Sequence, residues 1–423
     1  MPNRTTPPPI RDVANLRLPD IEEHRLDNGV PLYEIRMGTQ EVIKLEIVFQ
    51  AGRPFEKKQL AARGTNSLLR EGTRSFSAAS IAEQLDFYGC SLSFPFNLDT
   101  CNVILYSLNK HFGRVMPILE EILAAPSFPE AELNAFIKRN QHRLEIDLAK
   151  NDVVAYREIT ELIFGKGHPY GYNSFPETYG ALKRDDLLEH FSRLFNSGNC
   201  MAFISGKSSP EIIDMASERL SRAIPQGPAA RAASAGSPET PCARKIQRPE
   251  TVQTAIRIGR RLFNRQHEDY PGMYVLNTIL GGYFGSRLMG NIREEKGYTY
   301  NIYSMLDAML LDGYLYVGTE VGNEFVADTL RQIYVEMARL QEEPVEEEEL
   351  AMVRNYLMGN FLTMLDGPFN VSEVIRTQAV EGLPLSYFES MAEAVRNITA
   401  GELQRLAQRY LRREDMWEVV VGV

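Results

Sequence analysis

The stretch ILGGYFGSRLMGNIREEKGYTYNIYS, residues 279–304, combines several local signals that decide the fold. Its three glycines interrupt an apolar segment and predict a turn between two helices, at residues 267–280 and 284–296. The glycines lack the Lys-Ser/Thr pair of a phosphate-binding loop, so a structural turn is the favoured interpretation. The aromatic residues that follow, in YTYNIYSML, favour a β-strand.

Outward from this stretch, the order of elements in one half of the chain resembles that in the other. The first half predicts two short strands around the turn Asp27-Asn28-Gly29, a strand in VIKLEIVF, and later helices at residues 110–124 and about 130–165. Strands and helices return in a similar order after the middle of the chain. Runs of strands followed by runs of helices predict an α+β fold. We expect two homologous domains, each a mainly antiparallel sheet with helices packed on one side.

Changes in composition set the predicted domain boundaries. Residues 1–22 are polar and proline-rich at their start and predict an N-terminal arm, followed by a first domain at 23–224. Residues 225–241 are rich in Pro, Ala, Gly and Ser without an apolar period, which is typical of a linker. The second domain is expected at 242–423.

Charge and cysteine usage exclude some classes of protein. The 423 residues carry a net charge of −10, which argues against a nucleic-acid backbone as the main partner. No run approaches the roughly 18 apolar residues of a transmembrane helix, and no signal peptide is evident, so no membrane partner is expected. The four cysteines form no CxxC pair and are expected to be free thiols, which favours a cytoplasmic location.

Residues 279–304 resemble the C-terminal domain signature of the insulinase-like (pitrilysin) zinc peptidases: a Gly-rich turn, Ser-Arg-Leu, Arg-x-x-x-Gly and an aromatic strand. Other segments match the family in the family's order, and the resemblance covers about residues 23–423. These segments are LDNGVPLYEI, VFQAGRPFE, LREGTRSFSAASIAEQLDFYGCSLSF, GKGHPYGYNSFPET and SGNCMAFISGK.

Active members of that family carry the zinc motif HxxEH just before a Leu-x-x-Gly-Thr landmark, in which two His bind the metal and the Glu activates water. Here the corresponding residues are Arg-Gly-Thr-Asn-Ser, so Arg63, Asn66 and Ser67 replace the His, Glu and His. A guanidinium repels Zn²⁺, and we expect no metal and no other cofactor in this chain. Glu145 is either a remnant of the distant third ligand or a solvated helix carboxylate.

The resemblance also implies a catalytic pair, an Arg and a Tyr seven residues apart, that reaches the zinc centre from the C-terminal domain. Arg293 and Tyr300 match that spacing, and Tyr298 competes for the role of the tyrosine because it would share one strand face with Tyr300. A plainer alternative makes Arg293 a surface helix residue beside Glu294 and Glu295.

Together these features resemble the non-zinc half of two-chain peptidases. The expected function is a catalytically incomplete subunit that is inactive alone. It supplies Arg293 and Tyr300 in trans to a peptide substrate at the zinc of a homologous HxxEH-bearing partner. The alternative is a non-catalytic structural or peptide-binding subunit of a larger assembly. A third possibility, an independent hydrolase with its own acid–base residues, has no Ser-His-Asp or Cys-His constellation to support it.

Overall fold

Two β-sheets organise the computed structural model, which describes residues 16–232, 240–249 and 251–422. The first sheet has the strand order β1-β2-β6-β3-β5-β4 and the second has the order β7-β11-β8-β10-β9. The strands of the first sheet are β1 (Glu22–Arg25), β2 (Pro31–Arg36), β3 (Val42–Phe49), β4 (Ser91–Ser93), β5 (Cys101–Leu108) and β6 (Cys200–Gly206). Those of the second are β7 (Ala243–Gln247), β8 (Gln253–Leu262), β9 (Ile302–Ala308), β10 (Gly313–Gly322) and β11 (Trp417–Gly422).

The two sheets share one topology. Without β1, the order β2-β6-β3-β5-β4 maps strand by strand onto β7-β11-β8-β10-β9. The directions agree as well: β2 and β6 are parallel, as are β7 and β11, and the other matched pairs are antiparallel. The predicted α+β fold of two homologous, mainly antiparallel halves is therefore confirmed.

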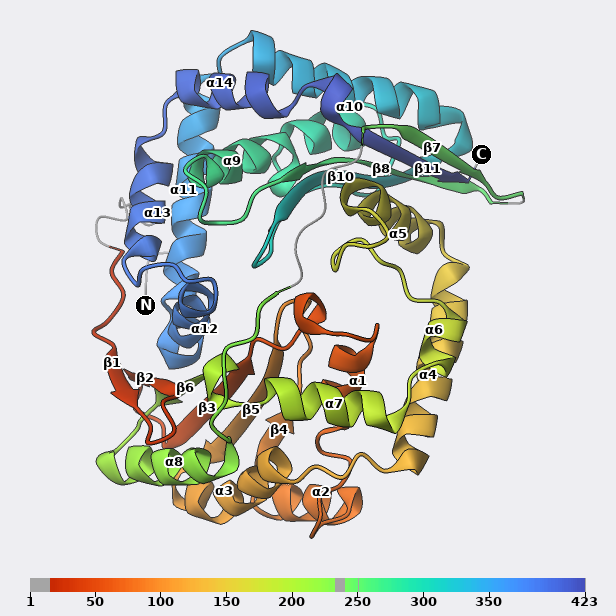
Figure 1. Ribbon diagram of the computed structural model, residues 1–423. Helices are drawn as coiled ribbons and strands as arrows, with labels where there is room; N and C mark the ends of the chain where they lie inside the picture. The colour runs from red at the N-terminus through yellow and green to blue at the C-terminus, as the bar shows by residue number, and fades with distance from the viewer. Residues whose placement is uncertain (1–15, 233–239, 250, 423) are drawn as a thin grey trace, which may run out of the picture.

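The helices follow the strands in a similar order in both halves (Figure 1). The N-terminal half contains α1 (Ala61–Leu68), α2 (Ala78–Phe87), α3 (Asn109–Ala124), α4 (Glu130–Leu148), α5 (Asn151–Phe164), α6 (Pro176–Gly180), α7 (Arg184–Leu194) and α8 (Pro210–Ala223). The C-terminal half contains α9 (Tyr270–Asn277), α10 (Val326–Glu342), α11 (Glu347–Met364), α12 (Gly367–Val380), α13 (Tyr387–Asn397) and α14 (Ala400–Tyr410). Two π-helical turns, η3 (Thr278–Gly282) and η4 (Met289–Glu295), follow α9, and the short 3-10 turn η5 (Asn323–Phe325) precedes α10.

Some predicted elements differ from the observed ones. The single helix expected at residues 130–165 is two helices, because Lys150 adopts an extended conformation between α4 and α5. The sequence analysis did not predict β7, α7 or α13. Part of the predicted arm, residues 1–15, and part of the predicted linker, residues 233–239, lie outside the described residues.

Strand β3 shows why each half needs the other. Its sequence VIKLEIVF is buried along nearly its whole length, so both of its faces are covered. Ile43, Leu45 and Ile47 face the helices of the N-terminal half. Lys44 and Glu46, on the opposite face, are 1% exposed although they are charged.

One face of each sheet is covered by a helix from the other half, on the side that looks toward the middle of the molecule (Figure 1). Helix α12, from the C-terminal half, packs Val371, Ile375 and Val380 against the N-terminal sheet. Helix α5, from the N-terminal half, packs against the C-terminal sheet, where it contacts Tyr314 and Trp417 among others. The sequence analysis anticipated the helices that each half places on its own sheet but not this exchange. The exchange joins the two halves into one body.

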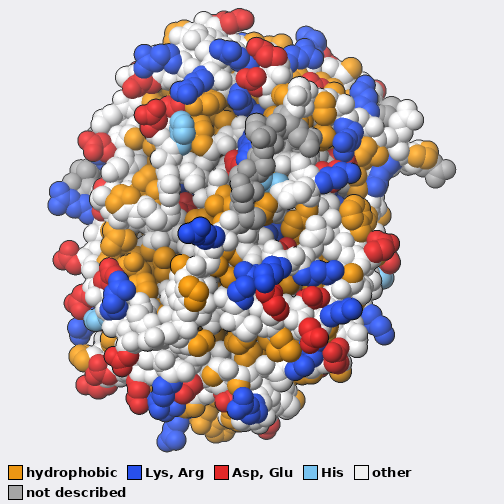
Figure 2. Space-filling model, viewed as in Figure 1, with side chains coloured by type: hydrophobic (Ala, Val, Ile, Leu, Met, Phe, Trp, Pro, Cys, Tyr) orange, Lys and Arg blue, Asp and Glu red, His pale blue; other side chains and the backbone are white. Residues whose placement is uncertain are grey.

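The surface gives no sign of a specialised environment on the face shown in Figure 2. Acidic and basic side chains are interspersed over that face. No helix in the described part of the chain combines the length and hydropathy that a bilayer crossing requires.

Candidate functional site

Helix α1 carries the positions where active relatives hold their metal, and here it is a packing element. Asn66 is completely buried, and its side-chain nitrogen donates to the carbonyl oxygens of Phe94 and Pro95 at 3.0 and 2.9 Å. These bonds satisfy the buried NH2 group of Asn66 and link α1 to the segment that follows β4, whereas the side-chain oxygen of Asn66 has no partner among the described residues. An acidic side chain at this position would face the same two carbonyl oxygens.

Other positions that correspond to the zinc motif also make structural contacts. The Arg63 guanidinium donates to the hydroxyl of Tyr179 at 3.2 Å. Gly64 lies so close to α7 that an added Cβ would stand 2.8 Å from the side chain of Leu187. Ser67, one turn after Arg63, offers only a half-buried hydroxyl.

The residues of α1 therefore do not fit a zinc ion. Catalytic zinc needs three protein ligands drawn from His, Cys, Asp and Glu, and α1 presents a guanidinium, an amide and a hydroxyl instead. Glu145 lies on α4 with its side chain 64% exposed, 3.9 Å from His142 of the same helix. Among the described residues, three potential ligands come together at Glu22, His24 and Glu34, on β1 and β2 and not on α1.

The structure does bring Arg293 and Tyr300 together. The guanidinium carbon of Arg293 lies 5.5 Å from the ring centre of Tyr300 and 4.5 Å from that of Phe284. Both rings are largely exposed, Tyr300 at 88% and Phe284 at 63%. The face of an aromatic ring attracts a cation, so both rings restrict the guanidinium of Arg293 at the surface. We call these three residues the arginine cluster.

The backbone around the arginine cluster is held by a tight helix end. Arg293 lies on η4, whose neighbouring residue Ile292 is fully buried and anchors the turn in the core. Gly297 then adopts a positive φ of 67°, a conformation that suits glycine at the end of a helix. The chain reverses there, and the amide of Tyr298 donates to the carbonyl of Ile292 at 3.1 Å.

Tyr298 and Tyr300 differ in their environments. The ring of Tyr298 stacks on Phe325 with centroids 4.4 Å apart, and its hydroxyl donates to Asp328 at 3.0 Å. The hydrogen bond to Asp328 and burial both raise the pKa of Tyr298. The expectation that the two tyrosines share one strand face is wrong, because β9 begins only at Ile302. Tyr298 is thus a packing residue, and Tyr300 is the tyrosine whose ring lies against Arg293.

The segment that presents Tyr300 is rigid. Thr299 donates through its hydroxyl to the carbonyl of Glu320 at 2.7 Å, and Thr319 donates to the carbonyl of Asn301 at 2.9 Å. These bonds tie both neighbours of Tyr300 to β10. A side chain on such a support keeps its position, which is what a binding or catalytic group requires.

Chemically, the arginine cluster offers several N–H donors and one phenol hydroxyl on an exposed surface. Among the described residues no carboxylate forms an ion pair with Arg293, although Glu294 and Glu295 follow it directly in the sequence. The sequence analysis missed Phe284. The available signal was an aromatic residue inside Gly-Gly-Tyr-Phe-Gly, where a plain turn needs none.

Comparisons with known proteins agree with this geometry. Residues 181–357 match the family described as "Peptidase M16 inactive domain". The chain is 22% identical over 406 residues to "Uncharacterized zinc protease YmxG" of Bacillus subtilis, which covers 93% of this chain and 96% of the relative. It is 23% identical over 404 residues to "Non-peptidase homolog YmxG" of Helicobacter pylori, covering 89% and 88%.

Solved structures share the fold. A peptidase M16 inactive domain from Pseudomonas fluorescens superposes with a TM-score of 0.86 at 22% identity and covers 95% of this chain and 98% of its own. A protease from Helicobacter pylori gives a TM-score of 0.85 at 12% identity, with coverage of 96% and 100%. The family segments in order, the duplicated fold and residues 181–357 make the chain similar to the M16, or insulinase-like, metallopeptidases, and its α1 lacks their zinc motif.

Proposed function

We propose that this chain is the non-zinc subunit of a two-chain metallopeptidase. In this proposal Arg293 and Tyr300 act in trans on a peptide that is bound at the zinc of a homologous, HxxEH-bearing partner. The observation that carries the proposal is the arginine cluster: a guanidinium without a carboxylate partner among the described residues, near two exposed rings on a rigid support. The sequence of helix α1 also supports the proposal, because it contains no metal ligands.

The division of labour follows from the chemistry of peptide hydrolysis. The metal and the water-activating glutamate would come from the partner, where zinc supplies Lewis-acid activation. Attack on the peptide carbonyl develops negative charge on its oxygen, and preorganised donors stabilise that charge by a few kcal/mol. The phenol hydroxyl of Tyr300 is such a donor, and the planar guanidinium of Arg293 can bind a carbonyl or carboxylate.

The position of the arginine cluster suits a bound peptide. Tyr300 stands two residues before β9, and β9 is an edge strand that pairs only with β10 within the described sheet. An extended peptide can add to such an edge through main-chain hydrogen bonds. A peptide on β9 would place part of its backbone near the arginine cluster.

The test mixes the full chain with an HxxEH-bearing homologue and measures kcat/KM on a fluorogenic peptide. Arg293→Ala is expected to lower kcat/KM by about 100-fold and Tyr300→Phe by about tenfold, in line with loss of transition-state donors. Tyr298→Phe and Arg409→Ala are matched controls, since Tyr298 bonds Asp328 and Arg409 bonds Asp269. An unchanged rate for both cluster variants, in a mixture that still cleaves, contradicts the catalytic role.

A second candidate is a non-catalytic structural or peptide-binding subunit. Two relatives favour it by name: "Non-peptidase homolog YmxG" of Helicobacter pylori and "Probable inactive metalloprotease YmfF" of Bacillus subtilis. The same mixing experiment separates the candidates, because a structural subunit changes the partner's rate independently of Arg293. The four free cysteines support a reducing compartment, and we propose the cytoplasm.

A further inference from the structure

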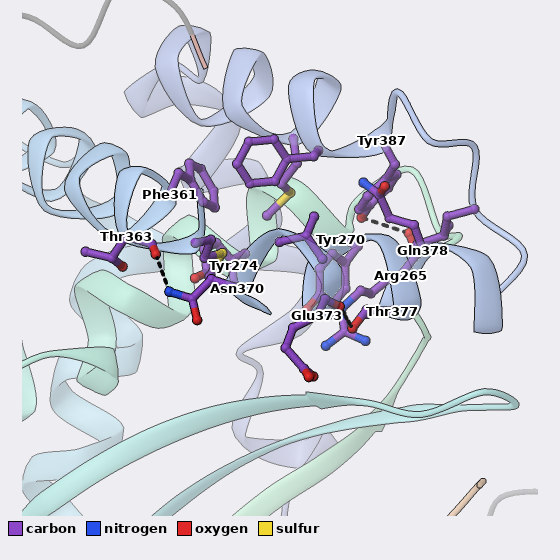
Figure 3. Close-up of a pocket in the computed structure, with 15 residues that line it drawn as sticks. Arg265, Tyr270, Tyr274, Phe361, Thr363, Asn370, Glu373, Thr377, Gln378 and Tyr387 are labelled. Atoms are coloured by element: carbon purple, nitrogen blue, oxygen red, sulfur yellow. Dashed lines mark hydrogen bonds between the residues drawn. The ribbon is translucent and has the colours of Figure 1, made fainter. Parts of the chain in front are cut away.

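A cavity of about 540 Å³ lies in the C-terminal half, between α9, α11, α12 and α13 (Figure 3). Its walls are mainly aromatic and aliphatic side chains, which come from all four helices and the loop before α13. The residues that matter most for its shape are Tyr270, Tyr274, Phe361, Leu383, Phe388 and Met391. This size and lining are typical of sites that take small ligands or single large side chains.

The charged groups at the rim of this cavity already have partners. Arg265 forms an ion pair with Glu381. Glu373 forms ion pairs with Lys44 and with Arg376, the latter at 2.5 Å. A charged ligand would find no unpaired opposite charge among these groups, and its desolvation would be uncompensated. The cavity therefore favours an uncharged, apolar group.

Polar groups with unused hydrogen-bonding capacity also reach the cavity. Among the described residues, the hydroxyl of Tyr274 has no hydrogen-bond partner, although burial raises its pKa. The amide nitrogen of Asn370 donates to the carbonyls of Thr363 and Asp366, both at 3.0 Å, which leaves its oxygen as an acceptor (Figure 3). A hydroxyl and an amide oxygen beside an apolar cavity match the N–H and C=O groups of a peptide backbone.

The cavity adjoins the seam between the two halves. A smaller cavity of about 210 Å³ is lined by Asn97 and Asp99 of the N-terminal half and by Arg265, Thr377 and Leu310 of the C-terminal half. Arg265 and Thr377 line both cavities. An extended chain that follows the seam would therefore pass the mouth of the larger cavity.

We infer that this cavity receives a bulky, uncharged side chain, such as Phe, Leu or Met, of a bound peptide. The inference adds a substrate preference to the proposed function and rests on its premise that the chain binds peptides. Burial of such a side chain supplies the affinity, while Tyr274 and Asn370 bond the adjacent backbone. A free apolar compound shares the side-chain chemistry but lacks the backbone, so the two sources can be distinguished.

The test uses the full chain alone, without partner and without cleavage. Three probes are titrated: a fluorescent Gly-Gly-Phe-Gly-Gly peptide, the same peptide with Asp in place of Phe, and N-acetyl-phenylalanine amide. The Phe peptide is expected to bind at least about tenfold more tightly than the Asp peptide and than the single-residue amide. The NMR signal of the labelled Met391 methyl group should shift during the titration, because Met391 lines the cavity.

Variants locate the binding. Val374→Phe fills the cavity from α12 and is expected to weaken the Phe peptide by at least about tenfold. Val335→Phe is the matched control, since Val335 is an exposed valine on α10 and does not line the cavity. Tyr274→Phe removes one hydrogen bond and should weaken the peptide by about threefold to tenfold, with less effect on the single-residue amide.

Several results would overturn the inference: equal affinity for the Phe and Asp peptides, equal effects of Val374→Phe and Val335→Phe, or a static Met391 signal. Equal affinity for the peptide and the single-residue amide would overturn the peptide source in favour of a free apolar ligand. If binding fails while partner-dependent cleavage still requires Arg293, the inference alone fails. If binding succeeds while Arg293 proves dispensable for cleavage, the proposed catalysis alone fails.

Discussion

The two halves share the same strand order and strand directions, yet the helices that follow their central strands have different surroundings. In the N-terminal half, α1 is packed tightly: Gly64 lies against α7, and the side-chain nitrogen of buried Asn66 donates to two carbonyl oxygens. In the C-terminal half, α9 borders a cavity, and η4 carries the exposed guanidinium of Arg293. One backbone framework thus supports a closed structural site in one half and an open, donor-rich surface in the other.

The two junctions between the halves also differ, in the kind of side chains that form them. Besides its apolar contacts, helix α12 meets the N-terminal sheet through an ionic cluster, in which buried Lys44 lies 2.8 Å from Glu46 and also pairs with Glu373. Burial alone lowers the pKa of Lys44, but the two carboxylates outweigh it and raise the pKa. Helix α5 meets the C-terminal sheet mainly through apolar and aromatic contacts, including a 2.7 Å hydrogen bond between Tyr156 and Tyr314. The ionic junction is therefore the one that a single substitution damages more.

Helix α1 is the region in which we expect a single substitution to lower the stability of the protein most. Asn66→Glu, which restores the acidic residue of the zinc motif, would bury a carboxylate against two carbonyl oxygens. The free energy of unfolding should fall by about 4 kcal/mol or more, measured by urea denaturation. Asn134→Glu, on the exposed side of α4, is the control and should change it by less than about 0.5 kcal/mol. Equal stability of the two variants would show that α1 can still accept a catalytic acid.

Removal of the Lys44 side chain tests how much the ionic cluster contributes to the junction at α12. Lys44→Ala leaves Glu46 buried beside Glu373 with only Arg376 to compensate. We expect a loss of about 3 kcal/mol in the free energy of unfolding, because a broken buried pair leaves an uncompensated charge. Lys207→Ala, which removes the exposed pair with Glu41, should cost at most about 1 kcal/mol. Similar losses for both would mean that the buried cluster does not hold α12.

The tight core of the N-terminal half also predicts a pH dependence. His190 is fully buried on α7, its Nε2 bonds the carbonyl of Ala51 at 2.8 Å, and burial lowers its pKa to about 4. Between about pH 4 and 6.5 the unfolded state binds the proton more readily, so stability falls as the pH falls through this window. The shift corresponds to about 3 kcal/mol.

Replacement of His190 tests this source of acid sensitivity. In His190→Gln, the loss of stability between pH 6.5 and pH 4 should be smaller than in the wild type by about 3 kcal/mol, measured by urea denaturation at each pH. His142→Gln is the control, because the side chain of His142 is 76% exposed on α4. A slope that His190→Gln leaves unchanged would assign the acid sensitivity to other groups.

The smallest expected effect concerns the open surface of the C-terminal half. Phe284→Ala removes one of the two rings that hold Arg293 and should lower the kcat/KM of the two-chain mixture about threefold to fivefold, the value of an exposed cation–π contact. Phe87→Ala removes a ring from α2 that is exposed to 81%, against 63% for Phe284, and should have no effect. Rescue by Phe284→Trp, but not by Phe284→Leu, would show that the ring positions the guanidinium.

Much of the fold was readable because local signals coincide with elements. The turn at Asp27-Asn28-Gly29 joins β1 to β2, and the buried runs became β3, β5, β6, β8 and β10. The break between α4 and α5 was not readable, since LAKND contains neither proline nor glycine. That break exists because α5 must turn to reach the other sheet, where Asn151 bonds the carbonyl of Gln253 at 2.8 Å. Helices α7 and α13 carry apolar residues at helical spacing, in RDDLLEHFSRL and YFESMAEAVRN, and the sequence analysis overlooked this signal.

The amino-acid sequence by itself determined that this chain lacks the HxxEH metal motif and that Arg293 and Tyr300 are seven residues apart, because residue identity and spacing are properties of the chain. Only the tertiary structure decided that Tyr298 packs inward while Tyr300 lies against Arg293, that Phe284 completes the arginine cluster, and that each half lends a helix to the other. The physical reason is that burial, stacking and ion pairing depend on contacts between residues far apart in sequence, and no local pattern encodes them.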